Sequence, residues 1–314
     1  MSPTADYKIL TPLKLGDNLK LKNRLVVAPT TRARSDPVTR APIERNMVYY
    51  EQRAGAGLIV TEGTAISAQG FGWYGGPALY TDAQEAAWKY VVDRVHAQDG
   101  KIFLQAWHTG RQSHPSFHPT NEVVSAVDEF LQSSTNLRTD KYGGSFENRY
   151  RILHEIVEVL KTVFPASRIG VRLSPNGAFG GMGSSDNHEM FTYVFERLSE
   201  HGLAYLSVLD GFGFGYHDKS PTLTVFDVKK AFKGVVMANN SYTRDTAEGV
   251  VRSGAADLVA FGRLYMSNPD LAERVQNDWP VNDLIDYEFF WDGEKGDEGY
   301  ITIPTYQPTN GKTV

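Results

Sequence analysis

Short apolar runs rich in β-branched residues alternate along the chain with longer segments of helical period, and this alternation predicts βαβ units around a parallel sheet. Each run is compact and mainly apolar, as a strand buried on both faces should be. We expect strands at 24–28, 58–62, 102–107, 169–174, 204–209, 235–238 and 258–261. We expect helices at 43–53, 83–98, 147–163, 188–201, 224–231, 244–253 and 269–276, with Thr81, Thr243 and Asn268 as possible N-caps.

Composition narrows the possible functions. The chain of 314 residues carries a net charge of −5 and has no run of Lys and Arg, which argues against a nucleic-acid partner. It contains no cysteine, so disulfides, thiolate nucleophiles and cysteine-ligated metals are excluded, and any redox chemistry requires a cofactor. The first residues lack a signal-peptide pattern, and no apolar stretch approaches the roughly 20 residues of a membrane span. We therefore expect a cytoplasmic protein with no membrane association.

One segment breaks the alternation. Between residues 108 and 145 the chain has two prolines and a glycine pair, with only the short apolar run 123–127 between them. A structureless loop of this length is unusual within a compact domain. His114 and His118 lie here at i, i+4 spacing, but Pro115 and Pro119 forbid the helix that would align them, so no metal site is predicted. In the absence of repeats or linkers, we assign a single domain, 1–314.

Polar residues and glycines stand at the ends of the expected strands. Pro29, Thr30 and Thr31 follow the first strand, and Gly63 follows the second. A pocket for a flat cofactor needs a few fixed polar groups in otherwise apolar surroundings, and these residues could supply them. The alternative is that the threonines cap a turn and that Gly63 is a plain turn glycine.

Two of the expected strands, 102–107 and 169–174, carry unusual polar residues. Gln105 and Trp107 point the same way because side chains on a strand repeat every second residue. Arg172 stands alone among apolar neighbours, an expensive position unless the guanidinium meets an anion or hydrogen-bond acceptors. A core tryptophan and an internal ion pair are the alternative interpretations.

A phosphate site is indicated after the last two strands. In a (β/α)8 barrel, the loops after strands seven and eight bind phosphate with backbone N–H groups and a nearby cation. If the expected strands at 235–238 and 258–261 are the last two of such a barrel, Asn240 and Ser241 follow its strand seven, and Gly262 and Arg263 follow its strand eight. A simple turn with a surface arginine remains the alternative for the last pair.

Taken together over nearly the whole chain, these motifs resemble the Old Yellow Enzyme family of ene-reductases. The resemblance implies an FMN-binding (β/α)8 barrel that takes hydride from NADPH or NADH and reduces the C=C bond of an unsaturated carbonyl compound, as a monomer or homodimer. It implies flavin contacts at Pro29, Thr30, Thr31, Gly63, Gln105, Arg172, Asn240, Ser241, Gly262 and Arg263, although the family usually has glycine near Asn240 and Ser241. Arg172, Trp107 and Thr31 would be the catalytic residues, and Trp73, Trp107, Phe179 and Tyr300 would line the substrate pocket.

The resemblance also implies a missing block. In the family, strand four ends in His-x-x-Asn or His-x-x-His, whose side chains bind the substrate carbonyl oxygen, and a Tyr just beyond donates the proton. Here 123–126 is similar to the segment before that block and 127–132 to the segment after it. One βα unit, on the order of 30 residues with its crossover, is therefore expected to be absent. A single His-x-x-Asn occurs at His118 and Asn121, between prolines and after no apolar run, and we interpret it as coincidence.

Two other functions stay open at this point. The chain could be a truncated or splice-variant relic of the family that is impaired in catalysis. It could also be a phosphate-binding barrel lyase or isomerase, because one barrel fold hosts many chemistries. The second alternative would not require Gln105, Trp107 and Arg172 together.

Overall fold

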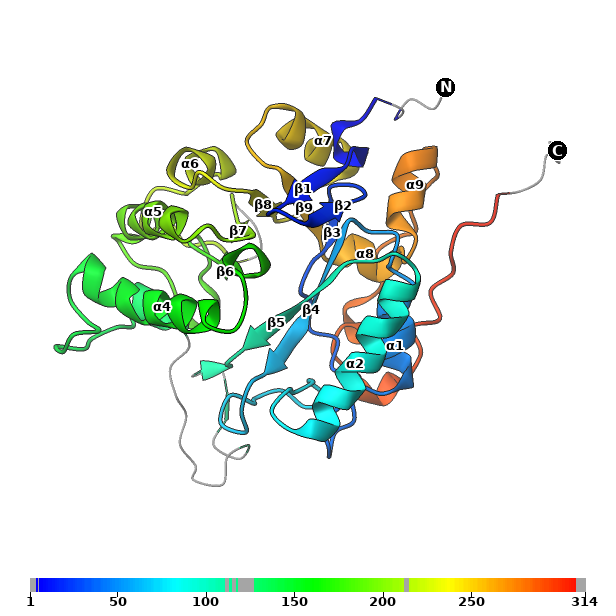
Figure 1. Ribbon diagram of the computed structural model, residues 1–314, viewed down its shortest axis with the longest axis horizontal. Coiled ribbons are helices and arrows are strands. Elements are labelled where there is room, and N and C mark those ends of the chain that lie inside the picture. The colour runs from blue at the N-terminus through cyan, green and yellow to red at the C-terminus, as the bar shows by residue number, and fades with distance from the viewer. Residues whose placement is uncertain are drawn as a thin grey trace.

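The computed structural model describes residues 4, 6–110, 113–114, 117, 127–211 and 215–308. Within them, parallel strands form one curled sheet surrounded by helices (Figure 1). The strands are β3 (Leu25–Val27), β4 (Leu58–Ala65), β5 (Ile102–Trp107), β6 (Gly170–Leu173), β7 (Tyr205–Leu209), β8 (Val236–Asn239) and β9 (Leu258–Phe261). Every strand expected from the sequence is confirmed, with bounds that differ by a few residues at most.

The sheet follows the plan of an α/β barrel but is open at one place. Its order is β5-β4-β3-β9-β8-β7-β6, so the first and last strands of the barrel, β3 and β9, pair with each other, for example through Val26 and Ala260. In the described part of the chain, β5 and β6 are the two edges and do not pair with one another. These two strands are consecutive in the sequence, and the opening coincides with the segment that breaks the alternation.

Helices cover the outer face of the sheet. They are α1 (Glu44–Glu51), α2 (Asp82–Ala97), α4 (Phe146–Lys161), α5 (Asn187–Leu198), α6 (Val225–Ala231), α7 (Arg244–Arg252) and α9 (Leu271–Asn277). Their buried apolar side chains pack against outward-facing strand residues such as Ile59, Leu206 and Val259 in one large core. Among the described residues, no helix is both long and apolar enough to cross a membrane.

The predicted N-caps are partly right. The hydroxyls of Thr81 and Thr243 accept hydrogen bonds from the amides of Gln84 and Thr246, as expected for N-caps. Asn268 is not the cap of α9, which begins after Asp270. Instead, the Asn268 amide donates a hydrogen bond to the Leu264 carbonyl at 2.9 Å, where it helps to end the preceding helix.

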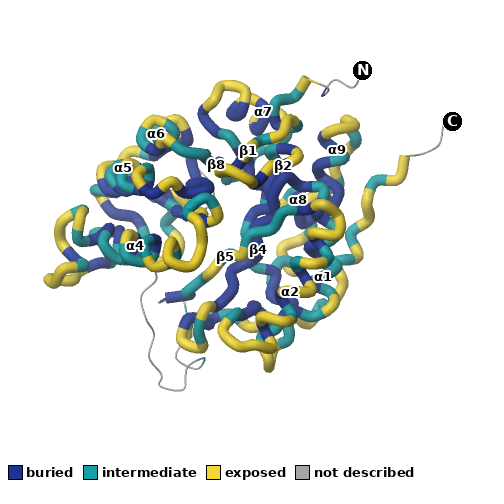
Figure 2. The backbone as a smooth tube through the Cα atoms, viewed as in Figure 1, coloured by how far each residue is buried: buried dark blue, intermediate teal, exposed yellow. Residues whose placement is uncertain are grey.

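A second core fills the inside of the barrel. Strand residues that alternate with the outward-facing set point inward, among them Val26, Val60, Tyr205 and Met237. Phe103 of β5 reaches Tyr205 of β7, with ring centroids 5.8 Å apart. Figure 2 shows the buried backbone concentrated in the strands and on the inner sides of the helices.

Several short elements were not predicted, because a segment of three to five residues is too short to show the hydrophobic period of a helix or a strand. An antiparallel hairpin of β1 (Leu13–Leu15) and β2 (Leu19–Leu21) packs its leucines under the inner core. The helices α3 (Val127–Leu131) and α8 (Arg263–Ser267) follow the opening and β9, respectively. Single 3-10 turns lie at Lys8–Leu10, Ala166–Arg168, Phe179–Gly181, Ser199–His201, Tyr287–Phe289 and Gly293–Lys295.

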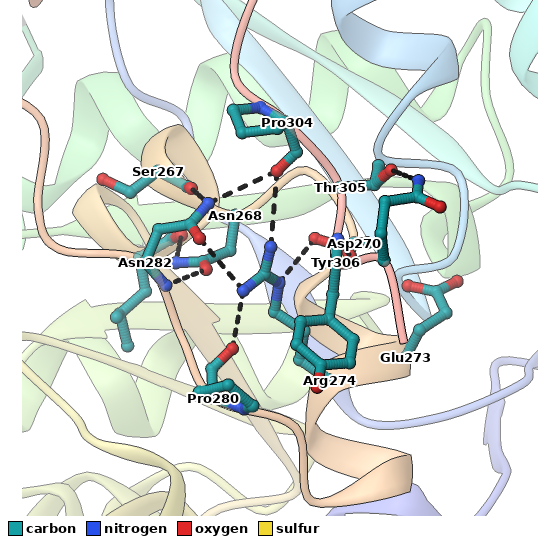
Figure 3. Close-up of polar contacts among 12 residues, drawn as sticks. Ser267, Asn268, Asp270, Glu273, Arg274, Pro280, Asn282, Pro304, Thr305 and Tyr306 are labelled. Carbon is teal, nitrogen blue, oxygen red and sulfur yellow. Dashed lines mark hydrogen bonds and ion pairs between the residues drawn. The ribbon is translucent and has the colours of Figure 1, made fainter. Parts of the chain in front are cut away.

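The C-terminal segment is fixed to α9 by one buried arginine (Figure 3). Arg274 donates to Asp270 at 2.7 Å, to the Pro280 carbonyl at 2.6 Å and to the Pro304 carbonyl at 3.3 Å. The other carboxylate oxygen of Asp270 accepts from the Tyr306 amide at 2.7 Å. This network ties the two ends of the segment, at Pro280 and at Pro304 and Tyr306, to Asp270 and Arg274.

Candidate active site

The residues singled out in the sequence gather at one end of the barrel, because the carboxyl ends of parallel strands meet there. Thr30 follows β3, Trp107 ends β5, and Asn239 ends β8. Gly63 lies in the last part of β4, and Gly262 comes directly after β9. We refer to this end, where the loops follow the strands, as the barrel mouth.

Gly63 and Trp107 are packed against each other in the barrel mouth. A Cβ atom added to Gly63 would lie 2.3 Å from Cε3 of Trp107, so no larger residue fits without moving the indole. The register of β4 on β5 shifts between Val60 and Gly63, which brings this glycine into place. Gly63 is therefore not a turn glycine but a strand residue that makes room for Trp107.

Trp73 and Trp107 line the same small pocket, together with Phe71 and Thr109. Trp73 also meets Trp291 edge to face, with ring centroids 5.8 Å apart. The C-terminal segment thus contributes an aromatic residue beside the mouth. Nothing in the local sequence around Trp291 indicated this role.

The loop after β3 is anchored by Glu62, a residue that was not among those expected at the site. The Oε2 atom of Glu62 accepts hydrogen bonds from the backbone amides of Arg32 and Ala33, both at 3.0 Å. The Oε1 atom accepts a longer hydrogen bond, of 3.4 Å, from the Tyr50 hydroxyl. Desolvation raises the pKa of this buried carboxyl, and the two amide bonds oppose that rise. The carboxylate therefore anchors the loop at Arg32 and Ala33.

Arg172 points into the barrel mouth from β6. Its Nη2 atom donates to Oδ1 of Asn239 at 3.4 Å, and the Asn239 amide donates to the Ala260 carbonyl at 2.7 Å. The hydrogen-bond partner is thus a neutral amide and not the carboxylate of an internal ion pair. The side chain retains exposed surface in the open barrel, yet desolvation by the surrounding protein lowers its pKa to about 10. The guanidinium is therefore charged at neutral pH.

The two loops of the expected phosphate site lie side by side. Arg263 donates from Nη2 to the Ser241 hydroxyl at 3.2 Å. Ser241 has a φ of +55°, the left-handed conformation that glycine adopts most readily. A Cβ on Gly262 would lie 3.0 Å from Cγ2 of Thr30, so the loop after β9 closely approaches the loop after β3. The neighbouring Asn240 amide donates to the Asp210 carbonyl at 2.8 Å.

Two of the residues expected to line the substrate pocket, Tyr300 and Phe179, lie outside the small pocket that Trp73 and Trp107 line. Tyr300 is fully buried, stacks on Tyr49 with ring centroids 4.3 Å apart, and accepts from the Asn46 amide at 3.1 Å. Its place in the substrate pocket is therefore corrected: it belongs to the core beneath the C-terminal segment. Phe179 lies in a 3-10 turn after β6 and is 65% exposed.

An acidic residue lies near Arg172 at the opening of the barrel. Asp128 of α3 accepts from the Gln132 amide at 3.2 Å, while its Oδ1 atom is buried without a hydrogen-bond partner among the described residues. Burial raises the pKa of Asp128 to about 7, and the positive charge of Arg172 opposes that rise. His118 and Asn121, and most of the run 123–127, lie outside the described residues.

The comparisons with known proteins agree on one family. The model of the NADH:flavin oxidoreductase / NADH oxidase family matches residues 8–129 and 126–282, in two pieces that meet at the opening of the barrel. The chain is 32% identical to 12-oxophytodienoate reductase 1 of Oryza sativa subsp. japonica, over 90% of this chain and 89% of that protein.

Solved structures are similar as well. Morphinone reductase superposes with a TM-score of 0.89 at 30% identity and covers 99% of this chain and 100% of its own. The Old Yellow Enzyme homologue of Zymomonas mobilis superposes with a TM-score of 0.87 at 30% identity, over 95% of this chain and 99% of its own.

Proposed function

The chain belongs to the NADH:flavin oxidoreductase / NADH oxidase family, the Old Yellow Enzyme family, and on this premise we propose how its barrel mouth serves the reaction. It is an FMN oxidoreductase of the ene-reductase type that uses NAD(P)H. When bound, FMN supplies the transfer of hydride from NAD(P)H to the activated C=C bond of an unsaturated carbonyl compound. The protein's own part is to hold the flavin and the substrate in the mouth.

The residues at the barrel mouth fit a flavin mononucleotide. A flat ring needs a few fixed polar groups in an otherwise apolar pocket, and the loop after β3, which Glu62 anchors through the Arg32 and Ala33 amides, supplies them. A phosphate needs backbone donors near a cation, and Ser241 with Arg263 lies where a barrel places that site. We assign the ring to Pro29, Thr30, Thr31, Gly63 and Gln105, and the phosphate to Asn240, Ser241, Gly262 and Arg263.

Arg172 would place a fixed positive charge beside the ring. Its hydrogen bond to Asn239 holds the guanidinium in the mouth, and a preorganised charge stabilises negative charge that develops next to it. We assign Arg172, Trp107 and Thr31 to the catalytic centre. Trp73, Trp107 and Phe179 remain as the proposed walls for a small unsaturated carbonyl compound.

The single observation that carries these assignments is the hydrogen bond between Arg263 and Ser241, which joins the loops after β8 and β9. The test is a titration of the purified chain with FMN, monitored by the quenching of flavin fluorescence. Stoichiometric binding is expected. A chain that folds but binds no FMN at saturating concentration would contradict the proposal, and binding that survives at the same affinity without Arg263 would place the phosphate elsewhere.

We also propose that one βα unit is absent between β5 and β6. Three observations support this: the sheet is open there in the described residues, the family match divides at 126–129, and the alignment with 12-oxophytodienoate reductase 1 has 348 positions for a chain of 314 residues. Because the alignment takes in about 90% of this chain, or about 283 residues, about 65 of those positions have no residue of this chain.

The absent unit is the one that the resemblance associates with substrate activation. Without it, the chain lacks the pair of side chains that would bind the carbonyl oxygen and the Tyr that would donate the proton. We therefore propose that the flavin site is largely retained while reduction of the substrate is impaired. A single domain over 1–314, a cytoplasmic location and a monomeric or homodimeric state remain part of the proposal.

A further inference from the structure

A cluster of His154, Glu158 and His201 lies on the outer helical layer, away from the barrel mouth. His154 and Glu158 are one helical turn apart on α4, and His201 ends the 3-10 turn that follows α5. One ligand atom from each of the three lies within 4.8 Å of the others. His201 comes four residues before β7, so the cluster is near the amino end of that strand, opposite the mouth.

The tautomer of His201 follows from its contacts. Its Nδ1 atom is 2.9 Å from Oε1 of Glu158, and a carboxylate can only accept, so Nδ1 carries the proton. The Nε2 atom is then an acceptor. It faces Nδ1 of His154 at 3.5 Å and receives a hydrogen bond from the Tyr150 hydroxyl at 3.0 Å.

The separation of the two ring nitrogens suits a shared cation better than a hydrogen bond. At 3.5 Å it is beyond the usual range of N–H hydrogen bonds. Two nitrogens bound to one tetrahedral Zn²⁺ at about 2.0–2.1 Å would be about 3.4 Å apart. The Glu158 carboxylate behind His201 matches the arrangement in which an acid orients a ligating histidine.

We propose that His154 Nδ1 and His201 Nε2 bind a divalent transition-metal ion of the Zn²⁺ type, with Glu158 orienting His201. Water molecules complete the coordination. The Tyr150 hydroxyl gives up its hydrogen bond to His201 Nε2 when the ion binds. The ion links α4, which flanks the opening of the barrel, to the connection between α5 and β7. It acts on stability and not on the redox reaction, since the amino end of a barrel serves stability while the chemistry takes place at the opposite end.

The test is calorimetric titration of the FMN-loaded chain with ZnCl₂ in a buffer without chelators. We expect one Zn²⁺ per chain, and a melting temperature that rises by at least about 2 °C when zinc exceeds its Kd 100-fold. His154→Ala should abolish this binding, because His154 is exposed and its loss should leave the fold intact. Glu158→Gln should weaken it about 10–100-fold.

His96→Ala, which removes a histidine of α2, serves as the matched control and should bind zinc like the unaltered chain. His201→Gln provides the second ligand variant, and its melting curve reports whether it folds. Wild-type chain that takes up no zinc would overturn the proposal. So would zinc binding that persists in both His154→Ala and folded His201→Gln, or that is lost in His96→Ala.

Discussion

Arg263 and Ser241 are joined by a hydrogen bond of 3.2 Å between Nη2 and Oγ, although 21 residues of chain separate them. The bond connects the loop after β8 to the first residue of α8, directly after β9, and it places a cation next to a serine in the left-handed conformation. Barrels of this plan frequently bind phosphate with the loops after their last two strands.

Removing that cation tests the phosphate assignment. Arg263→Ala should weaken FMN binding by about 1.5–3 kcal/mol, the range for a hydrogen bond to a charged group. The measurement is an FMN titration monitored by flavin fluorescence. Arg168→Ala removes an exposed arginine of a 3-10 turn before β6 and should leave the affinity unchanged. Equal dissociation constants for the two variants would show that the phosphate lies elsewhere.

Gly63 is expected to tolerate no side chain. Its Cβ would lie 2.3 Å from the Trp107 ring, so Gly63→Ala should cost about 1–3 kcal/mol of stability and shift the tryptophan fluorescence. Gly249→Ala is the control, because Gly249 lies in α7 and nothing lies within 4 Å of its added Cβ. That variant should be stabilised by about 0.5–1 kcal/mol. Chemical denaturation of both variants decides the point, and similar effects would contradict the packing described.

Glu62 is expected to position the loop after β3. In Glu62→Ala the buried amides of Arg32 and Ala33 lose their acceptor, which should cost at least about 2 kcal/mol of unfolding free energy and lower FMN affinity about tenfold or more. Glu62→Gln retains an oxygen acceptor and should lose less than half as much. If Glu62→Ala bound FMN normally, the loop would not depend on this carboxylate.

Asp128 should make stability depend on pH. Its folded pKa of about 7 lies above the ordinary value of 3.8, so the folded state favours the neutral acid. The stabilisation that the neutral Asp128 carboxyl contributes to the folded state is therefore fully present below about pH 4. It falls as the pH rises towards 7 and stays low at higher pH. Asp128→Asn should raise the unfolding free energy by about 1–3 kcal/mol at pH 8 and by nearly nothing at pH 4. Melting temperatures across this range provide the measurement, and a gain that is the same at both ends would refute the assignment.

The strands and long helices are predictable because each strand is a compact, mainly apolar run and each covering helix has an apolar face. The apolar run at the start of 58–62, for example, predicts β4, although the strand continues to Ala65. The hairpin of β1 and β2 is not predictable in this way, since its three-residue strands show too little alternation. The opening that the described sheet shows between β5 and β6 was indicated by residues 108–145, where the alternation of strand and helix patterns stops, and by the resemblance to the family.

Site residues differ in how readily the sequence reveals them. Arg172 and Gln105 stand out as polar residues within apolar strands. Glu62 also interrupts an apolar strand, so its position in the sequence could have revealed it. Trp291 and the pair His154 and His201 could not be found, because only the folded chain brings their elements together. Tyr300 was misplaced since an aromatic residue in the tail suits a core and a pocket equally well.

The most direct test of the proposed impairment is the NADPH-dependent reduction of 2-cyclohexenone, measured per bound FMN, by the chain and by a form with a family βα unit inserted between residues 126 and 127. Loss of an oxyanion donor alone typically costs about 10²–10³-fold in rate. We expect the chain to bind FMN yet to turn over at least about 10²-fold more slowly than the grafted form. If the unaltered chain reduces the enone as fast as the grafted form does, the absent unit is not required for catalysis, and the proposed impairment is contradicted.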